Sequence, residues 1–188
     1  MKSLRTISLL AVVATVLIAS AAQAVPTGTL AVYIGDENHE AATIKPNTPT
    51  PLNIYVEGID DTIYAVDYKI GLPPDLLVMS NTYYPGALDF GSSSNGASIG
   101  LGECISSFQW TMDHEPLWVH TITVYSLGYF DATDITVGAY EGYQTTQPGP
   151  TYADCNGNLR LLSSKGATIA VTSVSNDENS WGAVKSLY

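Results

Sequence analysis

The chain has 188 residues, of which 18 are Asp or Glu and 7 are Lys or Arg, so its formal net charge is −11. A surface this acidic repels the phosphates of nucleic acids and of anionic lipids, and it therefore argues against nucleic-acid binding and membrane adsorption. The length suits one domain with a hydrophobic core of its own.

The N-terminus has the pattern of a secretory signal peptide. Lys2 and Arg5 precede an apolar run over 7–19, and the triplet AQA at 22–24 fits a signal peptidase site. The run is shorter than a bilayer-spanning helix, which makes a retained anchor the weaker alternative. We predict that residues 1–24 are removed and that the mature chain, with no membrane insertion, is secreted, extracellular or displayed at the cell surface, or stays in the periplasm. Removal takes the net charge from −11 to −13.

Short β-rich segments separated by turn residues follow the signal peptide. Val, Ile, Tyr and Thr dominate these segments, and Pro, Gly, Asn and Ser dominate the stretches between them. The expected strands are 29–34, 52–58, 63–72, 75–80, 97–105, 116–130, 134–140, the two arms of a hairpin over 152–162, and 167–174.

Two of these segments alternate in a way that predicts which side chains share a face. The expected core face of the third strand is formed by Tyr64, Val66, Tyr68, Ile70 and Leu72. One expected face of the long strand 116–130 is formed by Trp118, His120, Ile122 and Val124. In that position His120 is predicted to be a packed or edge histidine rather than a metal ligand.

About nine strands and no long helix are expected, and strands recur every 10–15 residues without helices between them. This pattern favours an all-β, antiparallel β-sandwich of the jelly-roll or immunoglobulin-like kind over βαβ units. We assign 25–174 to the sandwich, and 175–188 to a polar tether followed by a short C-terminal helix.

Cys104 and Cys155 are the two cysteines of the chain. In an exported protein an even number of cysteines indicates a disulfide. A bond between them would close a loop of 51 residues, worth about 4 kcal/mol by the chain-entropy estimate. Two free thiols are the alternative.

No motif for catalysis is present. The three histidines lack the spacing that would place two metal ligands on one face, and no GxSxG element occurs. Asp154, Asn156 and Asn158 alternate as D-x-N-x-N, which makes them a candidate structural calcium site. The dipeptide Asn156-Gly157 also predicts a type I′ hairpin turn. We expect a protein that is not an enzyme and has no cofactor other than this candidate calcium ion.

Aromatic residues are numerous, with twelve Tyr and three Trp. Exposed Tyr and Trp rings stack on sugars or anchor protein partners, although most of these rings could also belong to the core and its rim. The candidate ligand-stacking residues are Tyr83, Tyr84, Trp110, Tyr140 and Tyr143.

The sequence SWGAVKSLY at 180–188 follows the polar stretch SNDEN. A helix here would place Trp181, Val184 and Tyr188 on one apolar stripe. Because nine residues form a marginal helix alone, the stripe needs a partner. We favour recognition by sorting or anchoring machinery or by a neighbouring subunit, with docking on its own sandwich and an inert end as alternatives.

Two stretches resemble cohesin-like domains. They are YAVDYKIGLPPDLLVMS at 64–80, where a strand ends in a proline turn, and the hairpin DCNGNLRLL followed by GATIAV. The resemblance covers about residues 28–172. The wider group of such folds includes carbohydrate-binding modules and immunoglobulin-like surface domains. The resemblance implies a nine-stranded sandwich used for binding and not for catalysis. The Trp-Gly tail is similar to the endings of some exported bacterial proteins.

Together these observations predict a non-catalytic binding or structural module outside the cytoplasm, whose partner is a protein or an adhesion surface. The alternative is a secreted carbohydrate-binding module or a cryptic glycan-active protein, whose partner is an extracellular glycan.

Overall fold

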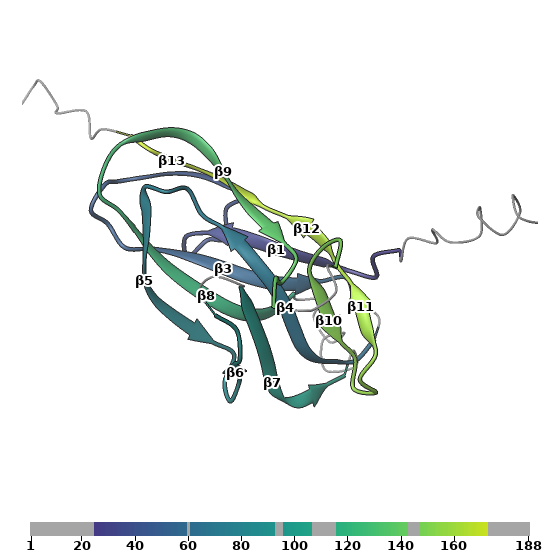
Figure 1. The fold of residues 1–188 in the computed structure, drawn as a ribbon. Helices are drawn as coiled ribbons and strands as arrows, with labels where there is room; N and C mark the ends of the chain where they lie inside the picture. Colours follow the sequence, from purple (N-terminus) through teal and green to yellow (C-terminus); the bar gives the residue numbers. More distant parts are fainter. Residues whose placement is uncertain (1–24, 60, 93–95, 107–115, 143–146, 173–188) are drawn as a thin grey trace, which may run out of the picture.

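The computed structural model describes residues 25–59, 61–92, 96–106, 116–142 and 147–172. These residues form two sheets that face each other in a sandwich (Figure 1), with thirteen strands and no helix among them. The predicted all-β sandwich is therefore confirmed. The signal peptide and the tail over 175–188 lie outside the described residues.

The strands are β1 (Thr29–Ile34), β2 (Ala41–Ile44), β3 (Thr50–Glu57), β4 (Ile63–Gly71), β5 (Leu76–Tyr83), β6 (Leu88–Asp89), β7 (Ala97–Ile105), β8 (Leu117–Ser126), β9 (Phe130–Gly138), β10 (Thr151–Ala153), β11 (Leu159–Leu161), β12 (Ser163–Lys165) and β13 (Ala167–Val171).

One sheet has the order β12-β1-β3-β8-β5. The other has the order β11-β10-β4-β9-β13-β2, and β7 and β6 extend it beyond β4. Most neighbours are antiparallel, as predicted, but β12 runs parallel to β1 and β2 runs parallel to β13. The chain passes from one sheet to the other at Gly166, between β12 and β13. A Cβ atom there would collide with the carbonyl oxygen of Ile135.

The core lies between the sheets and is built by alternation. In β3, for example, Leu52, Ile54 and Val56 are fully buried, and the residues between them are half-buried on the outer face. Strand β3 is central, since β1 and β8 pair with its two edges. Twenty-two hydrophobic residues from both sheets form one buried cluster, so the sandwich has a single interior.

Each of the two predicted faces is confirmed except at one residue, Tyr64 in β4 and Trp118 in β8, where a β-bulge shifts the alternation. In β4 the pairing with β7 slips between Ile63 and Ala65, which leaves Tyr64 48% exposed while Val66 and Tyr68 remain buried. In β8 the pairing with β3 slips next to His120, so that Trp118 lies on the outer face. A bulge adds one residue to one strand and reverses the face of everything beyond it.

The hairpin over 152–162 is confirmed by the antiparallel pairing of β10 and β11. Its turn is not of type I′, because that type needs a positive φ at two residues and only Gly157 (φ 82°) has one here. The Gly157 N–H donates to the Asp154 carbonyl oxygen, and Asp154 and Asn158 close the loop. The turn is therefore one residue longer than predicted.

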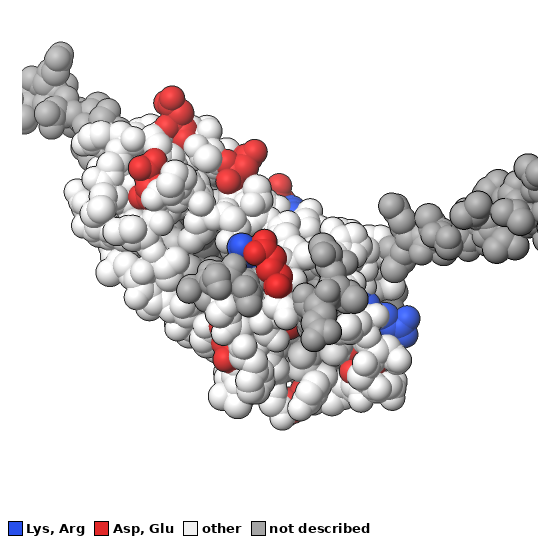
Figure 2. Space-filling model, viewed as in Figure 1, with Lys and Arg blue, Asp and Glu red and all other residues white. Residues whose placement is uncertain are grey.

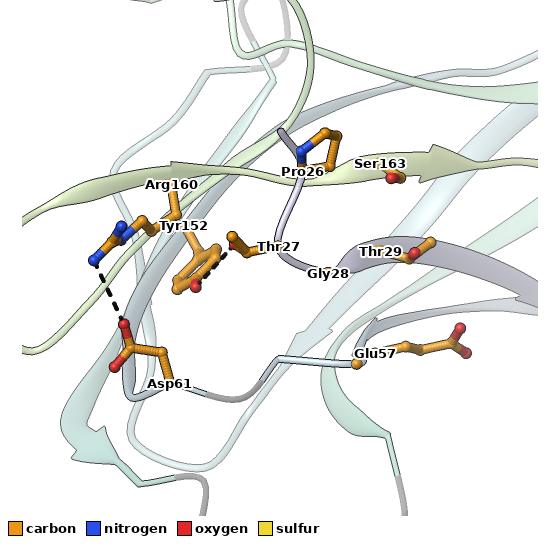
Figure 3. Close-up of a pocket in the computed structure, with 10 residues that line it drawn as sticks. Pro26, Thr27, Gly28, Thr29, Glu57, Asp61, Tyr152, Arg160 and Ser163 are labelled. Carbon is orange, nitrogen blue, oxygen red and sulfur yellow. Dashed lines mark hydrogen bonds and ion pairs between the residues drawn. The ribbon is translucent and has the colours of Figure 1, made fainter. Parts of the chain in front are cut away.

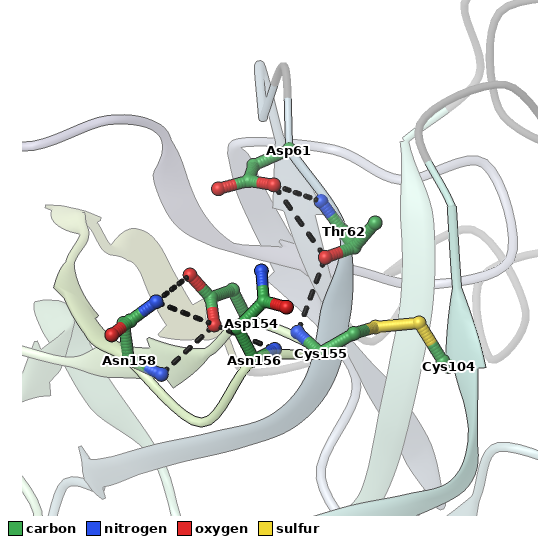
Figure 4. The surroundings of a disulfide bond; sticks show 7 residues. All are labelled: Asp61, Thr62, Cys104, Asp154, Cys155, Asn156 and Asn158. Carbon is green, nitrogen blue, oxygen red and sulfur yellow. Dashed lines mark hydrogen bonds between the residues drawn. A yellow bond between two sulfur atoms is a disulfide. The ribbon is translucent and has the colours of Figure 1, made fainter.

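The predicted disulfide between Cys104 and Cys155 is present (Figure 4), with the two Cα atoms 5.7 Å apart. It joins the end of β7 to the β10–β11 turn. The Cys155 N–H also donates to the Thr62 hydroxyl at 3.1 Å, just before β4 begins. Three segments distant in sequence are thus fastened at one place.

We expect the double variant Cys104→Ser/Cys155→Ser to unfold more easily by about 4 kcal/mol, because the cross-link restricts the unfolded chain. Urea unfolding of the variant against the oxidised wild type measures the difference. Wild type treated with a reductant should match the variant. A midpoint that neither change alters would show that the bond contributes nothing to stability.

Candidate functional site

Exposed apolar side chains gather along β5. Of the ten large hydrophobic residues that are exposed in the described parts of the chain, five lie between residues 77 and 90. Leu77, Val78 and Met79 are on β5 itself. Leu127 and Tyr129 are exposed in the loop that follows Ser126, the residue that pairs with Leu76 at the start of β5. We use the name β5 flank for β5 together with five exposed apolar residues on it or next to its start, which are Leu77, Val78, Met79, Leu127 and Tyr129.

The β5 flank is also an open sheet edge. Within the described residues β5 pairs with β8 on one side only. None of its eight residues is charged, in a chain with 18 acidic residues. In Figure 2 acidic side chains lie along the upper edge of the molecule, while the left flank, where Figure 1 places β5, carries almost no charge. Edge strands are usually protected by Lys or Pro, so an uncharged apolar edge indicates a surface that another segment covers.

A pocket of about 330 Å³ lies beside this edge, between the two sheets. We call it the inter-sheet pocket. One part of its wall is apolar and is formed by Ile70, Leu72, Val78 and Ile122. The other part is polar and is formed by Tyr68, Asn81, Tyr83, Asp89 and His120. The volume is at the lower end of the range for ligand pockets, enough for one large side chain.

The buried end of the pocket is organised around His120, which is 3% exposed. Its Nδ1 atom lies 2.7 Å from the Tyr68 hydroxyl, and its Nε2 atom lies 3.1 Å from Oδ1 of Asn81. A carbonyl oxygen can only accept, so Nε2 carries the proton and Nδ1 accepts from Tyr68. The neutral imidazole therefore has both nitrogens satisfied.

Tyr83 covers the imidazole from the solvent side. Its ring stacks on His120 with centroids 4.5 Å apart and planes 15° from parallel. Its hydroxyl donates to Asp89 at 2.9 Å, and the second oxygen of Asp89 accepts from the backbone N–H groups of Gly91 and Ser98. Partial burial and the hydrogen bond to the carboxylate raise the pKa of Tyr83 to about 12, so it remains a neutral donor.

This chemistry suits binding better than proton transfer. Burial raises the pKa of the Tyr68 hydroxyl well above its usual value and lowers the pKa of His120 to about 4. Both groups are therefore neutral at neutral pH and hydrogen-bonded to each other. The polar atoms hold β4, β5 and β8 together, and the apolar side chains form the rest of the wall.

A second cleft, of about 880 Å³, lies at the end of the sandwich where the described chain begins (Figure 3). Arg160 faces it, but its guanidinium lies 3.8 Å from Asp61 and 3.5 Å from Asp154. The Tyr152 hydroxyl is 3.2 Å from that of Thr27. Because two carboxylates offset the charge of Arg160, the described residues that line the cleft include no unpaired cation with which to hold an anion.

The candidate calcium residues form a hairpin cap (Figure 4). The Asp154 carboxylate accepts from the backbone N–H groups of Asn156 and Asn158 and from the side-chain amide of Asn158. The Asn158 amide thus turns its NH₂ group, not its oxygen, toward the carboxylate. The hydrogen bonds from Asn158 lower the pKa of Asp154. The three residues have a structural role that needs no metal, and calcium binding there stays a prediction.

A network of aromatic and polar side chains crosses the outer face of the β12-β1-β3-β8-β5 sheet. Trp118 Nε1 donates to Thr121, and Thr121 donates to Asn53 at 2.7 Å. From Asn53 the hydrogen bonds continue to Asn38 and then to the Tyr55 hydroxyl. Members of the network, which we call the outer-face network, are Tyr33, Asn38, Asn53, Tyr55, Trp118 and Thr121.

The candidate stacking residues have different environments. Tyr83 belongs to the inter-sheet pocket, and Tyr84 packs against the core cluster. Tyr140 is half-buried. Trp110 and Tyr143 lie outside the described residues, as do the tail residues Trp181, Val184 and Tyr188. Ligand stacking therefore stays a prediction for these aromatic residues.

Sequence reasoning missed both the Tyr68–His120–Asn81 cluster and the outer-face network. The cluster joins residues 39 and 52 positions apart in sequence, and the network depends on the bulge in β8. The one signal available was His120 inside an apolar strand, which favours a buried, hydrogen-bonded histidine.

No group of three or more His, Cys, Asp or Glu side chains that could hold a metal ion occurs among the residues that the structure describes. In the same residues no helix has the length and apolar character needed to cross a bilayer.

Comparison with solved structures finds cohesins. The cohesin module of a family 33 glycoside hydrolase from Clostridium perfringens is similar with a TM-score of 0.58 and 10% identity, covering 79% of this chain and 98% of the module. A non-cellulosomal cohesin from the archaeon Archaeoglobus fulgidus gives a TM-score of 0.50 and 11% identity, covering 82% and 97%. No protein-family model and no curated protein matches the sequence. The chain has a cohesin-like β-sandwich fold.

The buried His120 predicts a pH dependence of stability. Burial lowers its pKa from 6.5 to about 4, an effect that the nearby Asp89 partly opposes. Between these values the unfolded chain binds more protons than the folded one, so the free energy of unfolding falls as the pH falls from about 6.5 to 4. The full loss is about 3 kcal/mol.

Urea unfolding at several pH values between 4 and 7.5 measures this loss, and His120→Gln serves as the reference because it keeps a polar side chain without the titration. The wild type should show the steeper decline over this window. Parallel curves for the two proteins would contradict the assignment of the effect to His120.

Proposed function

We propose that the protein is a secreted or cell-surface, non-catalytic module that binds another protein through the β5 flank. The observation that carries the proposal is an uncharged, apolar, open edge strand on an otherwise acidic protein. The signal-peptide pattern at residues 1–24 supports export. The cohesin-like fold supports a binding role as far as fold alone can.

The flank offers the two elements that recognition by an added strand requires. The free backbone edge of β5 provides main-chain hydrogen bonds to an extended partner segment, and the inter-sheet pocket receives a side chain from it. Val78 takes part in both, because it lies on the edge strand, lines the pocket and is 50% exposed. Affinity then comes mainly from backbone pairing, and specificity comes from the pocket.

The variant Val78→Lys tests this proposal, because a charged side chain on an edge strand opposes strand addition. Leu159→Lys is the matched control, since Leu159 is 51% exposed and lies on β11. Proteins that co-purify with the mature chain should be identified and purified, and their binding measured by calorimetry. Val78→Lys should weaken binding at least about tenfold, or about 1.4 kcal/mol, and Leu159→Lys should not. Equal binding by both variants would place the interface elsewhere.

The outer-face network supports a second candidate, a carbohydrate-binding module. Aromatic rings next to amide and hydroxyl groups match the apolar faces and hydroxyl edges of sugars. Lys165 Nζ lies 4.9 Å from the Tyr33 ring centroid and is also paired with the Glu40 carboxylate at 2.7 Å. The outer-face network lies on the face of the sheet, whereas the β5 flank lies at its edge, so the two candidate functions use different surfaces.

A glycan array with the mature chain tests the carbohydrate candidate. Trp118→Ala should abolish specific sugar binding because it removes the indole from the network, whereas Tyr129→Ala, which changes an exposed ring at the β5 flank, should preserve it. An array with no specific glycan, or one on which Trp118→Ala binds as well as wild type, rejects this candidate.

A further inference from the structure

The last described strand ends next to the β5 flank. In β13, Val171 pairs with Phe130, and in β8, Ser126 pairs with Leu76, the first residue of β5. Only three residues separate Ser126 from Phe130 in the chain. The described chain therefore leaves the sandwich at the end where β5 starts, as Figure 1 shows at the upper left.

The residues that follow β13 are long enough to reach the flank. Residues 173–180 span up to about 26 Å when extended, which is also about the length of an eight-residue strand such as β5. Residues 181–188 number eight, as β5 does. A chain leaving β13 and turning onto β5 would run parallel to it, away from Leu76.

The composition of this segment matches the flank. WGAVKSLY contains four large apolar side chains and one positive charge, and the tether before it is polar. The flank offers exposed Leu77, Val78 and Met79, and the pocket beside it has room for one large side chain. Large aromatic side chains in fitted pockets are the contacts that dominate interfaces, and Trp181 is the largest of the segment.

We propose that residues 181–188 add to the open edge of β5 in the same chain, with the Trp181 side chain in the inter-sheet pocket. An extended strand here replaces the helix that the spacing of Trp181, Val184 and Tyr188 predicts. The inference rests on the proposed function, because it assigns to the same surface an occupant from this chain, which a partner segment has to displace when it binds. It also accounts for an edge strand without protective charges, since a covered edge does not aggregate.

Hydrogen exchange of the backbone amides of β5 in the full mature chain tests this docking. Trp181→Ala removes the anchor, and Ser180→Ala is the matched tail control. We expect the amides of residues 76–83 to exchange at least about tenfold faster in Trp181→Ala than in wild type, because the added strand is released. Ser180→Ala should match wild type, and the thermal midpoint should confirm that each variant is folded.

Repeating the measurement over about a hundredfold range of protein concentration identifies which copy supplies the segment. Protection that does not depend on concentration supports docking in the same chain. Protection that rises with concentration overturns it in favour of a segment from a second copy. Equal exchange of the β5 amides in wild type and Trp181→Ala overturns the proposal that residues 181–188 dock on β5.

The two proposals fail separately. If a purified protein partner binds wild type but not Val78→Lys, while β5 exchange is indifferent to Trp181→Ala, the binding function stands and the tail inference is overturned. If Trp181→Ala deprotects β5 but no partner depends on Val78, the tail docks and the proposed function is rejected.

Discussion

Backbone hydrogen bonding at the sheet edge is the constraint from which the rest of the site follows. In the described residues β8 is fully paired between β3 and β5, so the ladder stops at β5. An edge strand avoids pairing with other chains only if charged side chains or a bulge oppose the pairing, or if another segment covers the edge. The bulge near Met79 twists the strand, but Leu77, Val78 and Met79 remain exposed. The apolar surface and the open ladder therefore coincide, and a single added segment would satisfy both.

The polar cluster explains how such an edge strand stays in place without many core contacts of its own. Most side chains of β5 are exposed, yet Asn81 and Tyr83 contact His120 on β8, and His120 contacts Tyr68 across the sandwich. Buried polar groups are costly unless satisfied. Once satisfied, they fix the distance between the sheets and so keep the adjacent pocket open.

Sequence patterns predicted the features that depend on local alternation. The strand 29–34 has the bounds expected of it, β3 buries every second residue, and the two cysteines are bonded. Short or polar strands such as β2 and β6 were missed because they carry little hydrophobic signal. The positions of Tyr64 and Trp118 were wrong because one inserted residue reverses a face, and no composition rule locates a bulge. The pocket could not be predicted, since its residues come from strands that only the tertiary fold brings together.

The two ends of the sandwich are held by different kinds of interaction, and this difference bears on where binding occurs. Near the β10–β11 turn, a disulfide, the Asp154 cap and the Arg160 ion pairs fasten the chain. The second cleft lies there, but its arginine is paired with Asp61, and the Tyr152 hydroxyl is paired with that of Thr27. At β5 the holding interactions point inward, toward His120, and the outward backbone edge has no partner strand among the described residues. A binding surface needs unpaired hydrogen-bonding capacity and apolar area on a rigid support. In the described part of the molecule these three properties coincide at the β5 flank.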